Sequence, residues 1–251
     1  MDNLRKYLKN PPLEVLENAD ETDQQSGVLA PPIEKAIPEG ATLIPLIPRD
    51  RITLGSIPLV TAIGDRKSHR AYTDAAMTLE ELSYLLWATQ GIREIHPKRI
   101  HAFRTVPSGG CRHPFETYLR INRVEGVPAG LWRYSALEHT LISVWAERPV
   151  DSPSLAEVCF GQQFVDKAAV TFVWTAIPYR TEWRYGPDSL KDILITSGHI
   201  CQNLYLACES IGAGTCAILA YDQAKLDPYL GVDGDDEISL YVAPVGKVPS
   251  H

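Results

Sequence analysis

A short basic segment at residues 66–72, which we call the clamp segment, holds the first residues that could do chemistry. It reads Arg66-Lys67-Ser68-His69-Arg70-Ala71-Tyr72, in a chain with 24 Lys and Arg against 31 Asp and Glu and a formal net charge of −7. Two planar guanidinium groups and a hydroxyl are donors that suit a phosphate dianion. The segment therefore predicts a phosphate site held by Arg66, Ser68 and Arg70, with Lys67 alongside. A solvated basic turn is the alternative interpretation.

A second candidate is the sequence Pro107-Ser108-Gly109-Gly110, which we call the 107–110 loop. Proline fixes φ and lacks an N–H group, while the two glycines let the backbone come close to a ligand. The remaining N–H groups could then donate to the edge of a flat ring. A plain surface turn is the alternative.

A third stretch satisfies the dinucleotide fingerprint G-x-G-x-x-A, with Glu237 about 20 residues further on, where that motif wants an acid. Its fixed positions are Gly212, Gly214 and Ala217. The fingerprint must follow a strand and open a helix, whereas here it ends a helical pattern and precedes a strand-like run. We interpret it as a tight helix-to-strand turn whose backbone, at Ala213 and Gly214, approaches a flat ligand.

Two histidines, His96 and His101, invite a metal interpretation. Their separation does not put both on one helical face, and no H-E-x-x-H motif follows. Zinc would want more ligands nearby. A solvated basic loop is the favoured interpretation, and we expect no metal site.

The elements that position these residues begin with a well-marked helix after Thr78. Thr78 and Glu81 form an S/T-x-x-E capping box, and Leu79, Leu82, Leu85 and Leu86 recur at helical spacing up to Gly91. The clamp segment is therefore expected on a loop or first turn upstream of a helix, whose positive end would favour phosphate.

Further along the chain, the pattern predicts several strands and one long helix. Strands are expected at residues 118–124, 131–134, 139–144, 168–177, 215–220 and 237–243, and the long helix at residues 190–211. The sum is an α+β domain, a mainly antiparallel sheet with long helices packed on it.

The first sixty residues lack a clear period and are expected to form an extended N-terminal arm, residues 1–60, ahead of a domain at residues 61–251. A short helix is expected within residues 4–16, and residues 17–30 could equally be a disordered leader. Six prolines follow, at positions 31, 32, 38, 45, 48 and 58. Such a segment cannot form a regular helix.

Composition narrows the classes of protein. Hydrophobic residues make up 45% of 251 residues, and no apolar run approaches the ~18 residues of a membrane-spanning helix. The first ten residues show no secretory signal. Five cysteines without a Cys-x-x-Cys pair indicate reduced thiols in a cytoplasmic protein. The acidic balance argues against nucleic acid as a partner.

Taken together, the order of these motifs resembles the nitroreductase superfamily of FMN enzymes. The closest resemblance is to the SagB-type branch, the azoline (thiazole/oxazole) dehydrogenases that act on peptides. The resemblance covers roughly residues 60–248 and is carried by the clamp segment, residues 79–92, residues 104–118, residues 198–204 and Gly212-Ala213-Gly214.

This resemblance implies a nitroreductase-like fold, bound FMN and a homodimer with the FMN site at the subunit interface. The clamp segment would hold the phosphate, completed by Lys247. The 107–110 loop, given by the opposite subunit, and Ala213 with Gly214 would border the ring. NAD(P)H would give a hydride to flavin N5, and an acceptor such as a nitroaromatic or quinone would leave with the electrons. A small-residue patch at Ser197, Gly198 and Cys201 would suit close contact between the long helices.

One departure from the branch matters. The azoline-oxidising relatives carry a catalytic Lys-Tyr pair followed by glycine, and here the stretch is Arg184-Tyr185-Gly186. Arginine stays protonated and cannot act as a general base near neutral pH. Tyr185 is the candidate catalytic residue, as a proton donor or as an aromatic wall. A peptide azoline dehydrogenase in a larger complex and a non-redox flavin-handling protein stay open as alternatives. The sequence does not choose between NADH and NADPH or name the substrate.

Overall fold

A seven-stranded sheet in the order β1-β6-β5-β4-β7-β9-β8 carries the fold, and every neighbouring pair in it is antiparallel. The computed structural model describes residues 9, 21–98, 100–145 and 152–249, so the helix expected within residues 4–16 and the start of the arm lie outside the described residues. The strands are β1 (Leu43–Pro45), β4 (Phe115–Ile121), β5 (Gly130–Ser135), β6 (Thr140–Trp145), β7 (Val170–Ala176), β8 (Ala213–Thr215) and β9 (Ile238–Lys247).

The sequence of β7, an inner strand, explains why both faces of the sheet are covered. β7 reads Val-Thr-Phe-Val-Trp-Thr-Ala and is buried throughout, as expected of a strand rich in β-branched and aromatic residues. Successive side chains point to opposite faces. Phe172 and Trp174 join one apolar cluster, and Val173 joins the other. The predicted α+β class and antiparallel sheet are confirmed.

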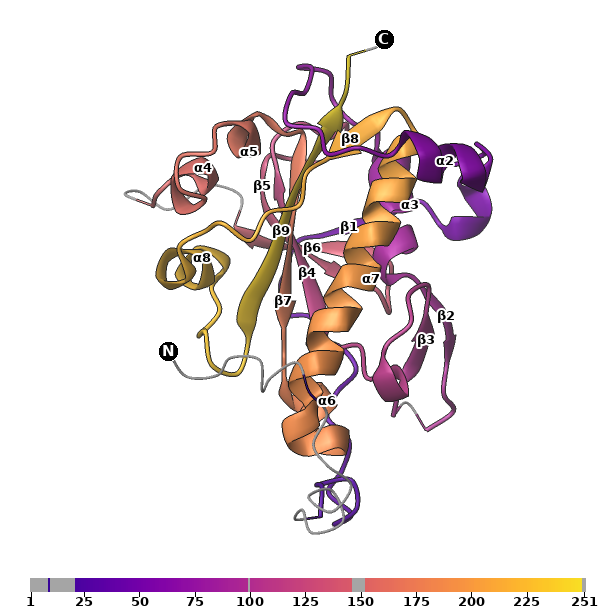
Figure 1. Cartoon of the computed structure of the whole chain (residues 1–251), viewed down its shortest axis with the longest axis vertical. Helices are drawn as coiled ribbons and strands as arrows, with labels where there is room; N and C mark the ends of the chain where they lie inside the picture. Colours follow the sequence, from indigo (N-terminus) through magenta and orange to yellow (C-terminus); the bar gives the residue numbers. More distant parts are fainter. Residues whose placement is uncertain (1–8, 10–20, 99, 146–151, 250–251) are drawn as a thin grey trace.

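Helices fill both sides of this sheet (Figure 1). The long helix α7 (Ser189–Glu209) packs Ile193, Ile200 and Leu204 on one face, together with the leucines of helix α3 (Leu79–Gln90). Short helices α4 (Leu155–Val158), α5 (Phe164–Lys167) and α8 (Gln223–Leu230) lie on the other. The predicted capping box is present, because Thr78 accepts from Glu81 N–H while the Glu81 carboxylate accepts from Thr78 N–H.

Other elements differ from the expectation. The strand predicted at residues 215–220 is mostly absent, since β8 ends at Thr215 and Ile218 makes only an isolated bridge to Val242. His96 and His101 lie at the tip of a hairpin, β2 (Ile92–Ile95) and β3 (Ala102–Arg104), and not in a simple loop. The elements not predicted include α2 (Leu59–Asp65), α6 (Tyr179–Tyr185) and the 3₁₀ turns at Arg49–Arg51, Gly109–Cys111 and Gly186–Asp188.

Around residues 32–36 the arm has no helix or strand of its own, and its backbone there is held by buried arginines. Arg180 Nε donates to the Pro32 carbonyl at 3.0 Å, and Arg104 donates to the Ile33 carbonyl at 3.2 Å. Arg133 donates to the carbonyls of Lys35 at 3.1 Å and Ala36 at 2.7 Å. Because proline-rich extended chain cannot pair its own carbonyls, these side chains take the place of a neighbouring strand.

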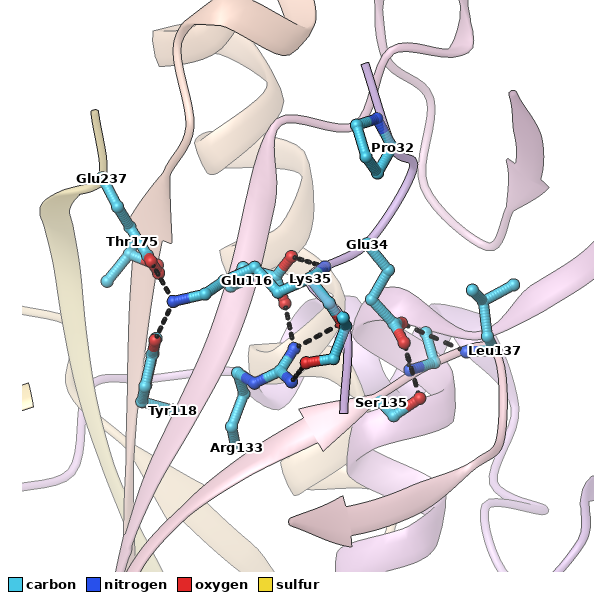
Figure 2. Close-up of polar contacts among 12 residues, drawn as sticks. Pro32, Glu34, Lys35, Glu116, Tyr118, Arg133, Ser135, Leu137, Thr175 and Glu237 are labelled. Carbon is cyan, nitrogen blue, oxygen red and sulfur yellow. Dashed lines mark hydrogen bonds and ion pairs between the residues drawn. The ribbon is translucent and has the colours of Figure 1, made fainter. Parts of the chain in front are cut away.

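A buried carboxylate lies at the centre of this contact (Figure 2). Glu116 accepts from Arg133 at 3.1 Å and from the Lys35 backbone N–H at 2.9 Å. It also accepts from Arg180 at 2.6 Å. The Lys35 ammonium pairs with Glu237 and donates to Tyr118 Oη at 3.0 Å.

The preceding residue points to the other side of the arm, because the side chains of an extended chain alternate. The Glu34 carboxylate accepts from Ala136 N–H at 2.6 Å and Leu137 N–H at 3.2 Å (Figure 2). Glu34 and Lys35 therefore fix the arm on both of its sides.

The cysteines form no disulfide bonds. Cys111, Cys159, Cys201, Cys208 and Cys216 are all free, and only Cys111 is not buried. Within the described ranges, no helix combines the length and apolar character needed to cross a membrane.

Candidate functional site

The clamp segment follows α2 directly and lies along the end of the sheet. Arg66 is the C-terminal cap of α2. His69 N–H donates to the Thr215 carbonyl at 2.9 Å, and Thr73 N–H donates to the Lys247 carbonyl at 2.9 Å. The segment therefore flanks β8 and the end of β9. It starts at the C-terminal, negative end of α2, whereas the helix whose positive end was expected to favour phosphate is α3, which begins at Leu79.

Tyr205 of α7 contacts the clamp segment. This residue was not predicted from the sequence as part of the site. Its hydroxyl lies 3.0 Å from Ser68 Oγ, and the Arg66 guanidinium lies 5.4 Å from the centre of its ring. The same hydroxyl accepts from Ala217 N–H at 3.0 Å. Tyr205 thus links the clamp segment to the turn after β8.

Gly214 is needed where the clamp segment touches β8. A Cβ atom at this position would lie 2.6 Å from the His69 ring and 2.6 Å from Val248, closer than real contacts allow. Tyr72 anchors the far end of the segment, because its hydroxyl reaches the carbonyls of His69 at 2.8 Å and Pro244 at 3.0 Å. Burial raises the pKa of Tyr72, so this hydroxyl stays protonated.

Lys247 lies beside the clamp segment, but its ammonium is engaged. It pairs with the Glu81 carboxylate and donates to the Ile211 carbonyl at 3.2 Å. The structure therefore brings Ser68, Gly214 and the backbone of Lys247 together, while the charge of Lys247 is directed toward α3.

The 107–110 loop lies against the first half of α7. Gly109 N–H donates to Asp192 Oδ1 at 3.0 Å, and His199 Nδ1 donates to the Pro107 carbonyl at 3.3 Å. Thr196 Oγ1 donates to Ser108 Oγ at 3.4 Å. Positions 192, 196 and 199 fall on one helical face, so α7 fixes three consecutive loop residues. The Gly109 N–H that we expected to face a ring is already paired.

Tyr185 and Arg184 lie directly over this loop. A Cβ atom at Gly110 would lie 2.7 Å from Tyr185 Oη and 2.8 Å from Arg184 Cδ, and Gly110 has a φ of 53°. Only glycine suits both the conformation and the close approach. The candidate catalytic residue therefore contacts the loop expected to border the ring.

The clamp segment and the loop sit at different levels of α7. The loop contacts positions 192 to 199, and the clamp segment contacts Tyr205. At a rise of about 1.5 Å per residue, these levels are roughly 9–20 Å apart along the helix. Within one chain, the two halves of the candidate site are therefore separate.

An apolar face of α7 lies exposed at the level of the 107–110 loop, and α2 exposes further apolar side chains. Leu190, Leu194 and Ile195 are 44 to 49% exposed on α7. α2 adds Leu59, Val60 and Ile63, which are 57 to 78% exposed. The small-residue patch differs from the prediction, because Ser197 and Cys201 are buried in their own chain. Only Gly198 of that patch is exposed, and a Cβ atom there would meet nothing within 4 Å.

A pocket of about 460 Å³ opens between α2, α3 and α7. Its lining includes Tyr84, Trp87, Asn203 and Leu206, but no residue of the clamp segment or the 107–110 loop. The pocket is therefore distinct from the predicted site. Among the residues that the structure describes, no group of three or more His, Cys, Asp or Glu side chains could hold a metal ion.

Comparison with known proteins identifies the family. Residues 63–247 match the family model described as Nitroreductase family. A protein of Methanocaldococcus jannaschii described as a nitroreductase is 30% identical over 191 residues, which cover 76% of this chain and 91% of that protein. The trifolitoxin-processing protein TfxB of Rhizobium leguminosarum bv. trifolii is 25% identical over 158 residues, which cover 60% of this chain and 41% of TfxB.

A solved structure gives the same result for the fold. The crystal structure of a protein from Ralstonia eutropha JMP134, described as a nitroreductase, superposes with a TM-score of 0.66 at 25% identity. The match covers 88% of this chain and 99% of that one. The predicted nitroreductase-like fold is confirmed.

Proposed function

Because the chain belongs to the nitroreductase family of oxidoreductases, we propose that it is an FMN-dependent NAD(P)H oxidoreductase. Bound FMN would supply the redox chemistry, taking a hydride from NAD(P)H at N5 and passing electrons to an acceptor such as a nitroaromatic or quinone. The residues present fit this group, since Arg66, Ser68 and Arg70 offer the donors that a phosphate monoester needs.

One observation carries the proposal furthest. The clamp segment is hydrogen-bonded to β8, and Gly214 leaves room for it where any Cβ atom would collide. The phosphate donors of the clamp segment are therefore held in place beside the buried backbone of Ala213 and Gly214. A fixed set of two guanidinium groups and a hydroxyl suits the phosphate end of FMN.

A homodimer would complete the site. If two copies of α7 cross antiparallel at the exposed Gly198, position 192 of one copy comes level with position 204 of the other. Asp192 holds the 107–110 loop, and Tyr205 supports the clamp segment. A two-fold pair of this kind would bring the loop of one subunit to the clamp segment of the other. It would also bury Leu194 and Ile195, which are exposed in the single chain.

Each part of the chain then has a distinct role. Arg66, Ser68 and Arg70 bind the phosphate, with Lys67 adding positive charge. Lys247 reaches the phosphate only if it exchanges its ion pair with Glu81.

The ring side of the site comes from other elements. The 107–110 loop, fixed by α7, shapes the wall beside the ring. The Tyr185 hydroxyl, held over Gly110, is placed to give a proton to the acceptor.

A peptide azoline dehydrogenase working in a larger complex is the second candidate. The relation to a trifolitoxin-processing protein favours it, since that name indicates a part in the processing of another product, trifolitoxin. Arg184 weighs against it, because an arginine cannot take the proton that a lysine could.

The absorbance spectrum of the purified protein tests the cofactor, followed by turnover with NADH and with NADPH. Bands near about 370 and 450 nm, typical of an oxidised flavin, and oxidation of either nicotinamide with a nitroaromatic or quinone are expected. Protein that takes up no FMN even after incubation with an excess of it would overturn the proposal. Flavin retained without any NAD(P)H turnover would indicate a flavin-handling protein.

A further inference from the structure

Positive charge gathers beside the 107–110 loop without a matching carboxylate. Arg112 is only 3% exposed, with its guanidinium 4.9 Å from the Trp183 ring centre. One of its nitrogens donates to the Ile100 carbonyl at 2.7 Å, and its buried Nε has no hydrogen-bond partner in the described part of the chain. A buried cation with an unused donor is costly unless an anion approaches it.

Arg184 extends this charge to the surface. Its side chain is exposed, and its guanidinium lies 5.5 Å from the Tyr185 ring centre. Among the described residues, no carboxylate lies within 4.0 Å of the Arg112 or Arg184 guanidinium. Asp192 of α7 accepts from Gly109 N–H through Oδ1, and its buried Oδ2 has no hydrogen-bond partner among the described residues.

Burial together with the positive charge of the arginines lowers the pKa of two neighbouring histidines. Burial first, and then the charges of Arg104 and Arg112, lower the pKa of His113 to about 3. Burial, then His96, Arg112 and Arg184, lower the pKa of His101. Both imidazoles are therefore neutral near pH 7, and the positive charge of this region belongs to the arginines alone.

The backbone beside Arg112 is strained. Gly110, Cys111 and His113 have φ values of 53°, 55° and 45°. Left-handed backbone at a residue other than glycine is unfavourable, persists only where the surrounding structure holds it, and tends to occur at functional sites. Here it accompanies the buried position of Arg112, beside the loop that would border the flavin ring.

We propose that Arg184, backed by Arg112, binds a carboxylate or similar anionic group of the electron acceptor, so that the enzyme prefers anionic aromatic substrates. This inference rests on the proposed function, because the acceptor would lie against the 107–110 loop. A guanidinium is always charged and presents a planar fork to a carboxylate. Arg184 cannot act as the general base that a lysine at this position could provide, but it can bind an anion. Tyr185 lies beside that anchor, close to the part of the substrate that must be protonated.

The first test measures binding without turnover. Benzoate and its neutral isostere benzamide are titrated into the purified protein by calorimetry, with Arg184→Gln, Arg184→Lys and Arg51→Gln alongside. Arg51→Gln removes the same charge from an exposed position in the 3₁₀ turn Arg49–Arg51. We expect benzoate to bind about ten- to hundredfold more tightly than benzamide, with the preference lost in Arg184→Gln, partly kept in Arg184→Lys and unchanged in Arg51→Gln. Equal binding of the two ligands, or a preference that survives in Arg184→Gln, overturns the inference.

The second test compares 4-nitrobenzoate with 4-nitrobenzamide as acceptors. The wild-type ratio of their kcat/KM values corrects for their different reactivity, and Arg184→Gln should lower that ratio by about ten- to hundredfold through KM. If Arg184→Gln instead weakens flavin binding while leaving the ratio unchanged, Arg184 acts on the cofactor and the inference is wrong. A protein that binds benzoate selectively but holds no flavin would keep the anion site and refute the proposed function.

Discussion

Replacing Glu116 with Gln should destabilise the protein far more than its single changed atom suggests. The Glu116 side chain is 2% exposed and pairs with Arg133 and Arg180, whose side chains are 5% and 4% exposed. Glutamine keeps one acceptor oxygen but turns an amide toward one arginine and leaves two buried positive charges without a counter-charge. Breaking a buried pair in this way costs about 3–5 kcal/mol.

Thermal and urea unfolding measure this cost directly. For a chain of this size, about 2–4 °C per kcal/mol translates it into a melting temperature roughly 6–20 °C lower. Samples must be compared at equal protein concentration, because a dimer melts at a concentration-dependent temperature. Glu94→Gln is the matched control, since Glu94 is an exposed residue of β2, and it should change stability by less than about 0.5 kcal/mol.

The pH dependence provides a second measurement. Burial alone would raise the pKa of Glu116, but the charges of Arg180 and Arg133 outweigh burial and hold it below its ordinary value of 4.5. A carboxyl with a lowered folded-state pKa stabilises the protein above 4.5, and this contribution is lost as the pH falls below that value. Glu116→Gln should therefore flatten the loss of stability in acid. A variant within about 1 kcal/mol of wild type at neutral pH, with an unchanged acid profile, would refute this account of Glu116.

Three further predictions concern the proposed site. Arg66→Glu should abolish FMN retention, because it puts a carboxylate against the phosphate and removes a contact worth about ten- to hundredfold in affinity; full flavin occupancy in its absorbance spectrum would show that the clamp assignment is wrong. Leu194→Glu places a charge on the exposed apolar face of α7, so light scattering should return a 27.8 kDa monomer in place of a dimer, and a wild-type protein that is itself monomeric with bound FMN would contradict the shared site. Tyr185→Phe should slow acceptor reduction by about 10²–10⁴-fold while flavin reduction by NAD(P)H stays unchanged; equal single-turnover rates with several acceptors would reduce Tyr185 to a wall residue.

Elements with strong local signals could be predicted from the sequence. The helix after Thr78 has its cap and its leucine stripe written within fourteen residues, and β7 is a continuous apolar run. Helix α2 was missed because it is short, follows Pro58 and exposes most of its apolar residues, so no buried stripe marks it. The strand predicted at residues 215–220 has the right composition, but β9 pairs with residues 213–215 instead.

In the site too, residues with a local sequence signal could be predicted and residues defined by distant contacts could not. The clamp segment and the two glycine turns have recognisable residue types, so they could be proposed in advance. Asp192, Thr196, His199 and Tyr205 could not, because their contacts join residues 83 to 137 positions apart. One signal was available in the sequence. Asp192, Thr196 and His199 are spaced so that they share one face of a helix, whereas our prediction of that helix used only its apolar stripe.

The way the arm is held has a consequence for the order of folding. The partners of residues 32–36 lie 71 to 202 positions further along the chain, at Arg104, Arg133, Arg180 and Glu237. Closing loops of that length carries an entropic cost before any contact repays it. Residues 32–36 can make these contacts only where the strands and helices that carry their partners have come together, so we expect this segment to dock late in folding.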